Sequence, residues 1–228
     1  MTFARALAAG LTVVAALLQG CSDSGPSEGT RIGSRLLDTL VTPETPPPAE
    51  PPTRAELESL DSAVIAVSSA EGALAYIVPL AVNGPYVSYY DSARRAVVLR
   101  GGAVARTHGL GFDLRGVRFA GEDPIATPRP LENWPGQVDR EYQFRVRDLH
   151  PYTITLTCVY QRGPRRGIEI VGRRHEVVEV TETCRNARRT VTNRYDVAPQ
   201  SGFIWRSTQW RGPDVPPLDI AVVRPFRG

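Results

Sequence analysis

Hydrophobic and polar residues alternate along most of the chain after residue 63, which is the pattern of half-buried β-strands. Two turn pairs, Asn83-Gly84 and Gly101-Gly102, tolerate positive φ and therefore favour hairpins between the runs that flank them. These β-rich runs are 73–82, 86–90, 95–99 and 103–106. The pattern predicts a mostly β fold that contains a meander of short antiparallel strands.

The later part of the chain predicts further strands, each with apolar residues at every second position. A turn is predicted at the stretch RGPR, residues 162–165, because glycine and proline interrupt the alternation there. The residues expected on the more apolar faces are Tyr142, Phe144, Val146, Ile154, Leu156, Cys158, Tyr160, Ile168, Ile170, Val178, Val180 and Cys184.

The stretch RTHGLGFDLRG, residues 106–116, contains one of the three histidines of the chain, two glycines and an aspartate. Its apolar residues alternate from Leu110 to Leu114, which predicts a strand with one apolar face and one nearly bare face. A bare face lets another backbone lie close or lets the strand bend. We therefore interpret the stretch as a sheet corner. The competing interpretation, a catalytic or ligand-binding pair of His108 and Asp113, is disfavoured because no further histidine stands at helical ligand spacing.

The N-terminus decides the expected compartment. Arg5 precedes an apolar run that is too short to span a bilayer comfortably but suits a secretory signal peptide, residues 1–20. The sequence LQGC that ends this run resembles the bacterial lipobox, in which the cysteine is lipidated before cleavage. Lipidation of Cys21 would bind the protein to a lipid bilayer through several buried acyl chains. The alternative is an ordinary secretory signal followed by an unrelated cysteine.

A spacer is expected to follow the lipidated residue. Residues 21–52 are rich in proline, which favours an extended polyproline II tether. Residues 53–228 are expected to form a single β-rich periplasmic domain. Thr53 and Glu56 have the spacing of a capping box, which predicts a short helix to about Leu60. Ser22 is not the aspartate that in enteric bacteria favours retention in the inner membrane, so we expect the periplasmic face of the outer membrane.

Two cysteines remain after lipidation of the first. In an oxidising periplasm they suggest a disulfide between Cys158 and Cys184, which would stabilise the fold by about 3 kcal/mol. A meander that turns at residues 162–165 places their strands two positions apart, at about 9.6 Å, which is too far for a disulfide. The bond therefore requires the sheet to fold over itself or the middle strand to stop short. Two buried free thiols are the alternative.

Composition and charge narrow the class of partner. The chain is 42% hydrophobic, which is ordinary for a globular protein, and its net charge is +3. Between Arg140 and Arg211 there are 14 arginines and 7 acidic residues, a surplus of seven that suits an anionic polysaccharide or phospholipid headgroups. A solvated sheet face with arginines and glutamates is the alternative. A nucleic-acid partner is not expected, because no nucleic-acid motif accompanies the arginines, and no metal site or cofactor is predicted.

Two tryptophans near the C-terminus are candidates for sugar contact. The stretch SGFIWRSTQWRGP, residues 201–213, predicts a strand, and an exposed tryptophan beside arginine presents a platform for a sugar ring. The candidate contact residues are Trp205, Arg206 and Trp210. The alternative is that both tryptophans close the core, where large aromatic side chains are usually found.

The lipobox, the strand meander that leads into the 106–116 stretch, the central strands and the closing tryptophan stretch together resemble the YjbF/GfcB family of lipoproteins. The resemblance covers roughly Ala63 to Phe226. The clearest marks are a Thr-x-Gly-Leu-Gly-x-Asp-Leu segment that starts at Thr107 and a Trp-x-Ser-x-Gln-Trp segment that starts at Trp205. The resemblance implies an accessory role in exopolysaccharide and group 4 capsule production, with an outer-membrane polysaccharide export component as a partner. It also implies a curved antiparallel sheet that approaches a barrel or sandwich, with few short helices. Neither segment is a catalytic signature.

Three functions follow as hypotheses. The first is a non-enzymatic lipoprotein that assists polysaccharide assembly or export. The second is a periplasmic enzyme acting on polysaccharide, with Asp113, Glu169 and Glu179 as candidate acids, which would require two carboxylates facing each other across a cleft. The third is a general envelope-assembly lipoprotein that does not contact sugar.

Overall fold

The computed structural model describes residues 52–70, 72–144 and 150–226. Within this part of the chain, the capping box is present: the side chain of Thr53 accepts from the backbone N–H of Glu56, and the carboxylate of Glu56 accepts from the backbone N–H of Thr53. The helix that follows, α2 (Arg54–Ser59), confirms the prediction. The predicted signal peptide, Cys21 and nearly all of the tether lie outside the described residues. No helix in the described ranges is long and apolar enough to cross a membrane.

Twelve strands and a short 3-10 helix, η1 (Leu131–Asn133), follow α2 in the described ranges. The strands are β1 (Val64–Ser69), β2 (Gly72–Asn83), β3 (Tyr86–Tyr90), β4 (Ala96–Arg100), β5 (Ala103–His108), β6 (Leu114–Phe119), β7 (Gln137–Phe144), β8 (Tyr152–Ile170), β9 (Arg173–Asn186), β10 (Arg189–Val197), β11 (Ile204–Gln209) and β12 (Leu218–Arg224). The hairpins predicted at Asn83-Gly84 and Gly101-Gly102 are both present, as β2–β3 and β4–β5.

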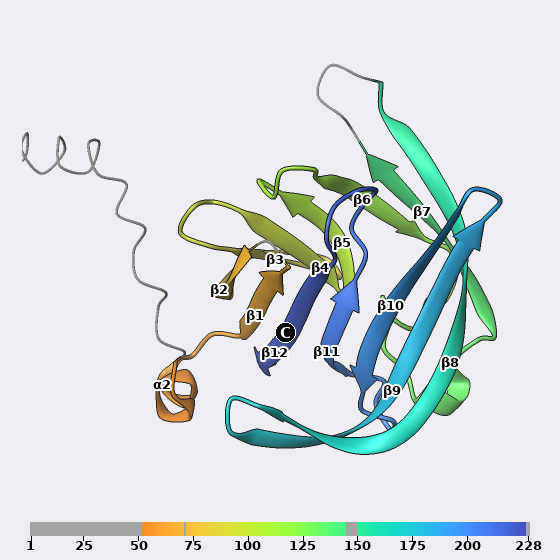
Figure 1. Ribbon diagram of the computed structural model, residues 1–228. Coiled ribbons are helices and arrows are strands. Elements are labelled where there is room, and N and C mark those ends of the chain that lie inside the picture. The colour runs from red at the N-terminus through yellow and green to blue at the C-terminus, as the bar shows by residue number, and fades with distance from the viewer. Residues whose placement is uncertain (1–51, 71, 145–149, 227–228) are drawn as a thin grey trace, which may run out of the picture. The chain divides into compact units, whose positions relative to one another are not determined.

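All strands belong to one antiparallel sheet with the order β5-β4-β3-β2-β1-β12-β11-β10-β9-β8-β7-β6. The two strands at the ends of this order, β5 and β6, follow each other in the chain and lie against each other, so the sheet curves into a nearly closed barrel (Figure 1). Closure matters because an open sheet presents two rows of unpaired backbone groups. The predicted mostly β fold, with a curved antiparallel sheet, is confirmed.

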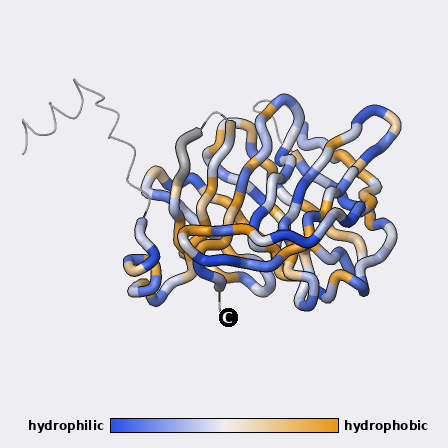
Figure 2. The backbone as a smooth tube through the Cα atoms, turned by 60° about the horizontal axis from the view of Figure 1, so that its bottom comes forward, coloured by the Kyte–Doolittle hydropathy of each residue, from blue (hydrophilic) through white to orange (hydrophobic). Residues whose placement is uncertain are grey.

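The barrel interior holds most of the hydrophobic core. Inward residues alternate with more exposed ones along much of β7 and β10, and Figure 2 shows the corresponding changes from orange to blue along the tube. The loop 120–136, between β6 and β7, closes part of the interior through Ile125, Leu131 and Trp134, which are buried against β9, β10 and β11. A hydrogen bond from Gly102 N to Ile125 O, 2.8 Å long, ties this loop to the β4–β5 turn.

The turn predicted at residues 162–165 is wrong. β8 continues through this stretch for 19 residues, and a shift of register between Arg162 and Arg165 absorbs Gly163 and Pro164 as a bulge. A bulge accommodates proline because the ladder is interrupted there and the missing N–H leaves no bond unmade. The chain instead turns at Val171-Gly172, where both residues have positive φ.

The end of the β8–β9 hairpin, residues 165–178, lies outside the barrel; we call it the hairpin arm. It packs on α2 and on the outer face of β1 and β12 in a separate apolar cluster, and in Figure 1 it extends along the bottom of the barrel toward α2. Arg54 of α2 donates from Nε to Val171 O and from Nη2 to Ile170 O, both at 2.9 Å. The buried members of this cluster are Leu57, Val64, Ala66, Ile168, Ile170, Val177 and Val223.

The stretch 106–116 is a corner, as interpreted, but the strand predicted from Leu110 to Leu114 is wrong. β5 ends at His108 and β6 begins at Leu114, and the loop between them turns through Gly109 and Gly111, which have φ of +74° and +83°. These values lie in the region that favours glycine, so the residues that made one face look bare are those that turn the chain. The apolar side chains of the loop still pack on the core.

Candidate functional site

The disulfide expected from the sequence is present between Cys158 of β8 and Cys184 of β9. The two cysteines are direct partners in the β8–β9 ladder, and both are fully buried. The sequence argument placed a strand between them because it assumed a turn at 162–165. Since β8 runs through that stretch, no strand intervenes and the bond forms across one pair of neighbouring strands.

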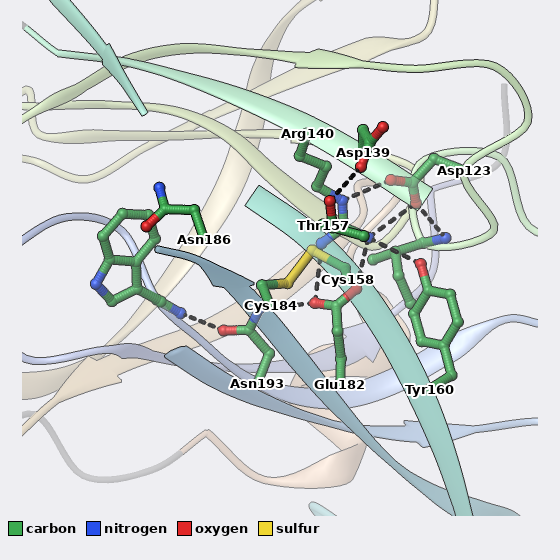
Figure 3. The surroundings of a disulfide bond; sticks show 12 residues. Asp123, Asp139, Arg140, Thr157, Cys158, Tyr160, Glu182, Cys184, Asn186 and Asn193 are labelled. Atoms are coloured by element: carbon green, nitrogen blue, oxygen red, sulfur yellow. Dashed lines mark hydrogen bonds and ion pairs between the residues drawn. A yellow bond between two sulfur atoms is a disulfide. The ribbon is translucent and has the colours of Figure 1, made fainter. Parts of the chain in front are cut away.

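Beside the disulfide, an arginine bridges two carboxylates inside the barrel (Figure 3). Arg140 of β7 lies 2.5 Å from Asp123 through Nε and 2.8 Å from Glu182 of β9 through Nη2. The side chain of Arg140 is 3% exposed, and both carboxylates are fully buried. Burial disfavours the charged guanidinium, but the attraction of Glu182 and Asp123 outweighs it and holds the pKa of Arg140 well above its ordinary value.

Further hydrogen bonds complete this inner cluster, which we define as Asp123, Arg140 and Glu182. Glu182 Oε2 accepts from Asn193 Nδ2 at 2.7 Å and from Tyr195 Oη at 2.9 Å. Burial raises the pKa of Tyr195, so its hydroxyl remains a donor. Asp123 also accepts from the backbone N–H of Ile125 within its own loop. Its ion pair with Arg140 of β7 fixes the loop 120–136 to the barrel wall. The inner cluster therefore has a structural role.

Glu182 also lies close to both cysteines, a combination that can bind a metal ion. The two sulfur atoms are bonded to each other, so neither is a thiolate, which is the form that ligates metals. The group therefore does not provide a set of metal ligands in this oxidised state.

The two sequence segments that carry the family resemblance meet at the seam between β5 and β6. Asp113 holds the corner by accepting from Gly109 N at 2.8 Å and from Leu110 N at 3.1 Å. Thr107 Oγ1 accepts from Leu114 N, 2.9 Å away, across the seam. Gln209 of β11 accepts from Val104 N of β5 at 3.0 Å and so satisfies one backbone N–H of that strand.

The residue directly after the second segment, Arg211, hydrogen-bonds to the first segment. Arg211 donates from Nη1 to Phe112 O at 2.8 Å and to Leu110 O at 3.3 Å. Gly212 lies so close to the Phe112 ring that an added Cβ would be 2.7 Å from it. These segments therefore close the barrel, and the structural interpretation of the 106–116 stretch extends to the Gln-Trp-Arg-Gly sequence at residues 209–212.

The three candidate sugar-contact residues lie in different surroundings. Trp205 is half-buried and stacks on His175 of the hairpin arm, with ring centroids 3.6 Å apart. Trp210 packs edge-on against Tyr142 at the core, at 5.0 Å. Arg206 is exposed and donates to Asp196 at 2.8 Å. The structure does not bring the two tryptophans together as one platform.

Arg206 instead belongs to a charged groove between the hairpin arm and the outer face of the barrel, which we call the outer groove. Its volume is about 440 Å³. Arg166 of the arm bridges Glu179 and Asp196, with both distances at 2.7 Å, and Asp196 is shared with Arg206. The charged, serine and threonine residues that line the groove are Ser68, Arg166, Glu179, Arg194, Asp196, Arg206, Ser207, Thr208 and Asp219.

The acids considered for catalysis are held in other ways. Asp113 is occupied by the corner, and Glu169 is exposed on the arm. Glu179 faces Asp196 across the β9–β10 ladder, but both carboxylates contact the guanidinium of Arg166. The sequence showed neither the outer groove nor the inner cluster, although Arg140 has the same parity as the apolar Tyr142 and Phe144, which was the available signal for the latter.

Comparisons with known proteins agree with this fold. A hypothetical lipoprotein, YmcC, from Escherichia coli K12 has a crystal structure that matches with a TM-score of 0.66 and 19% sequence identity, over 90% of this chain and all of that chain. At this identity the likeness concerns the fold. No curated protein matches the chain. The family model for the group 4 capsule polysaccharide lipoprotein GfcB/YjbF matches residues 34–223. Because this match spans most of the sequence, the chain belongs to the YjbF family of lipoproteins linked to group 4 capsule polysaccharide.

Proposed function

We propose that the protein is anchored by acylated Cys21 to the periplasmic face of the outer membrane and assists the assembly or export of polysaccharide without catalysing a reaction. Residues 1–20 act as the signal peptide, residues 21–52 as the tether and residues 53–228 as the periplasmic domain. The partners in this proposal are the lipid bilayer and an outer-membrane polysaccharide export component.

The proposal rests on the family to which the chain belongs, a family of capsule lipoproteins. It also rests on the structural role of the polar residues in the two family segments. Thr107, Asp113 and Gln209 are engaged in closing the barrel. A hydrolase needs two carboxylates that are free to act on the sugar. In the described ranges, the paired acids of the inner cluster and of the outer groove contact arginine side chains, which favours an accessory role over hydrolysis.

Membrane fractionation tests the anchor. Cys21→Ser should move the protein from the membrane fraction to the soluble periplasmic fraction, because the acyl chains supply the binding free energy. Sucrose-gradient separation of the two membranes then locates the wild-type protein. Continued membrane residence of Cys21→Ser contradicts lipid anchoring, and a band in the inner membrane contradicts the proposed location.

Deletion and a cleavage assay test the role. Deletion should reduce secreted polysaccharide, and the wild-type gene should restore it. The purified mature protein, incubated with that polysaccharide, should leave its size distribution and its number of reducing ends unchanged. Cleavage would favour the enzyme hypothesis. Unchanged secretion after deletion would favour a general role in envelope assembly.

A further inference from the structure

The outer groove has the shape of a built binding site. The hairpin arm is held in place at its apolar end, where Ile168 and Val177 pack against α2 and the outer face of β1 and β12. Nearer the barrel, small residues of β1 and β12, including Ser68 and Ala221, line the groove. Because these side chains are small, a hollow of about 440 Å³ remains beneath the arm. Such a volume lies in the range of small-molecule sites, about 300 to 1,000 Å³.

The charges of the groove are balanced. Three arginines, at 166, 194 and 206, face three acids, at 179, 196 and 219, so its formal net charge is zero. Thr208 donates to Asp219 at 2.5 Å through a single carboxylate oxygen, Oδ1. The side chain of Arg194 is exposed and makes no hydrogen bond or ion pair within the described part of the chain. The groove thus presents free donors and free acceptor positions side by side.

This arrangement selects a class of ligand. An apolar ligand would strip water from charged groups without replacing their hydrogen bonds, which is costly. A strongly anionic ligand would meet the three carboxylates as well as the arginines. A sugar hydroxyl donates and accepts at once, so neighbouring hydroxyls match a surface in which guanidinium and carboxylate groups alternate.

We propose that the outer groove binds a neutral, hydroxyl-rich saccharide segment, with Arg194, Arg206 and Asp219 as its main contacts. This inference rests on the proposed function, because it takes the ligand to be part of the polysaccharide that the protein helps to assemble or export. In this proposal the saccharide hydroxyls are recognised by hydrogen bonds to charged side chains and not by stacking on an aromatic ring. Trp205 is not among the residues that line the groove, and its ring stacks on His175, so it provides no platform there.

A binding measurement on the mature protein tests the site. The probe is a set of oligosaccharides of four to ten sugars, prepared from the polysaccharide secreted by the native strain, with any uronic acids reduced to neutral sugars. Binding is followed by line broadening of the oligosaccharide proton signals. Arg194→Ala should weaken binding about tenfold, the loss expected for one charged hydrogen bond. Ser68→Trp, which fills the groove, should abolish it.

Arg188→Ala is the matched control. Arg188 is an exposed arginine in the turn before β10, outside the outer groove, and its side chain makes no hydrogen bond or ion pair in the described ranges. The control should bind like the wild type, and thermal unfolding should show that all three variants are folded. Equal binding by Arg188→Ala and Arg194→Ala, or undiminished binding by Ser68→Trp, would place the saccharide elsewhere and overturn the proposal.

Varying the salt concentration and the charge of the probe shows whether the groove binds neutral or acidic saccharides. Binding of the reduced probe should change less than twofold between 50 and 300 mM NaCl, since no net charge is neutralised. Preference for the unreduced, acidic oligosaccharides with steep loss in salt would overturn the neutral class. If the wild type binds neither probe while deletion still reduces secretion, the groove inference is wrong and the accessory function stands.

Discussion

Two arginines in this barrel each bridge two carboxylates, and they differ chiefly in their exposure to water. Arg140 of the inner cluster holds Asp123 and Glu182 with a side chain that is 3% exposed. Arg166 of the outer groove holds Glu179 and Asp196 with a side chain that is 43% exposed. The distances are similar, between 2.5 and 2.8 Å in both sites.

The difference shows that burial, and not contact geometry, decides what such a bridge does. Inside the barrel no water replaces a lost partner, so removal of one charge leaves the others buried and uncompensated. In the outer groove the Asp196 carboxylate is only 5% exposed, but water reaches the guanidinium of Arg166 and the carboxylate of Glu179. An ion pair exposed to water in this way contributes about 0 to 1 kcal/mol. The inner bridge therefore fixes the fold, whereas the outer one is able to exchange its partners for a ligand.

The largest expected effect comes from breaking the inner bridge. Arg140→Ala should lower the free energy of unfolding by about 3 to 5 kcal/mol, because two buried carboxylates lose their counter-ion. Urea unfolding followed by tryptophan fluorescence measures this loss. Arg166→Ala is the matched control and should cost less than about 1 kcal/mol. Equal losses in the two variants would refute the role given to burial.

The disulfide beside the inner cluster should come next. Replacing both Cys158 and Cys184 by alanine should lower the free energy of unfolding by about 3 kcal/mol, since the bond closes a loop with a sequence separation of 26. Wild-type protein unfolded with and without a reducing agent provides the comparison. A variant as stable as the oxidised protein would show that the neighbouring ladder alone holds β8 to β9.

A smaller effect is expected from the shared acid of the outer groove. Asp196→Asn removes the carboxylate that Arg166 and Arg206 contact, and both arginines are then free to be solvated. We expect a loss of about 1 kcal/mol in the free energy of unfolding. Denaturant titration at low and high salt measures it, and the difference from the wild type should shrink in salt. A loss as large as that of Arg140→Ala would show that the ion pairs of the outer groove stabilise the fold as strongly as the inner cluster does.

The smallest effect concerns pH at the hairpin arm. Burial, with the charges of Arg173 and Arg54, lowers the pKa of His175 below its ordinary value of 6.5. The folded protein then binds fewer protons than the unfolded chain, so stability is unaffected well above pH 6.5 and decreases as the pH falls below it. His175→Gln should remove this part of the pH dependence in urea unfolding. An unchanged pH profile would show that His175 does not contribute.

Several parts of the fold were predictable because their causes are local. The hairpins at Asn83-Gly84 and Gly101-Gly102 depend on turn residues, and the capping box depends on Thr53 and Glu56 three positions apart. The alternation of apolar residues predicted which side chains of β8 and β9 are buried, but Ile168 and Ile170 are buried against α2 outside the barrel and not in its interior. Gly109 and Gly111 also marked a corner, because glycine allows the backbone to turn locally. The alternation of apolar residues nevertheless predicted a strand from Leu110 to Leu114, where the backbone turns.

The candidate site was predictable only in part. The two cysteines were identified, but whether they bond depended on the course of β8 at Pro164, and composition alone favours a turn there as much as a bulge. Arg206 was identified from its neighbour Trp205, yet the residues that share its groove come from other strands and from the hairpin arm.

Residues close together in the chain were enough to predict the capping box, the hairpins at Asn83-Gly84 and Gly101-Gly102, most strands and the family resemblance. They misplaced a strand at 110–114 and a turn at 162–165. Three features depend on the tertiary structure alone: the bridge from Arg140 to Asp123 and Glu182, the hydrogen bond from Val104 N to Gln209, and the groove between the hairpin arm and the barrel wall. These contacts join residues 17 to 105 positions apart. Closure of the barrel brings these distant residues together. The local pattern of residues does not indicate which distant side chains will meet when the barrel closes.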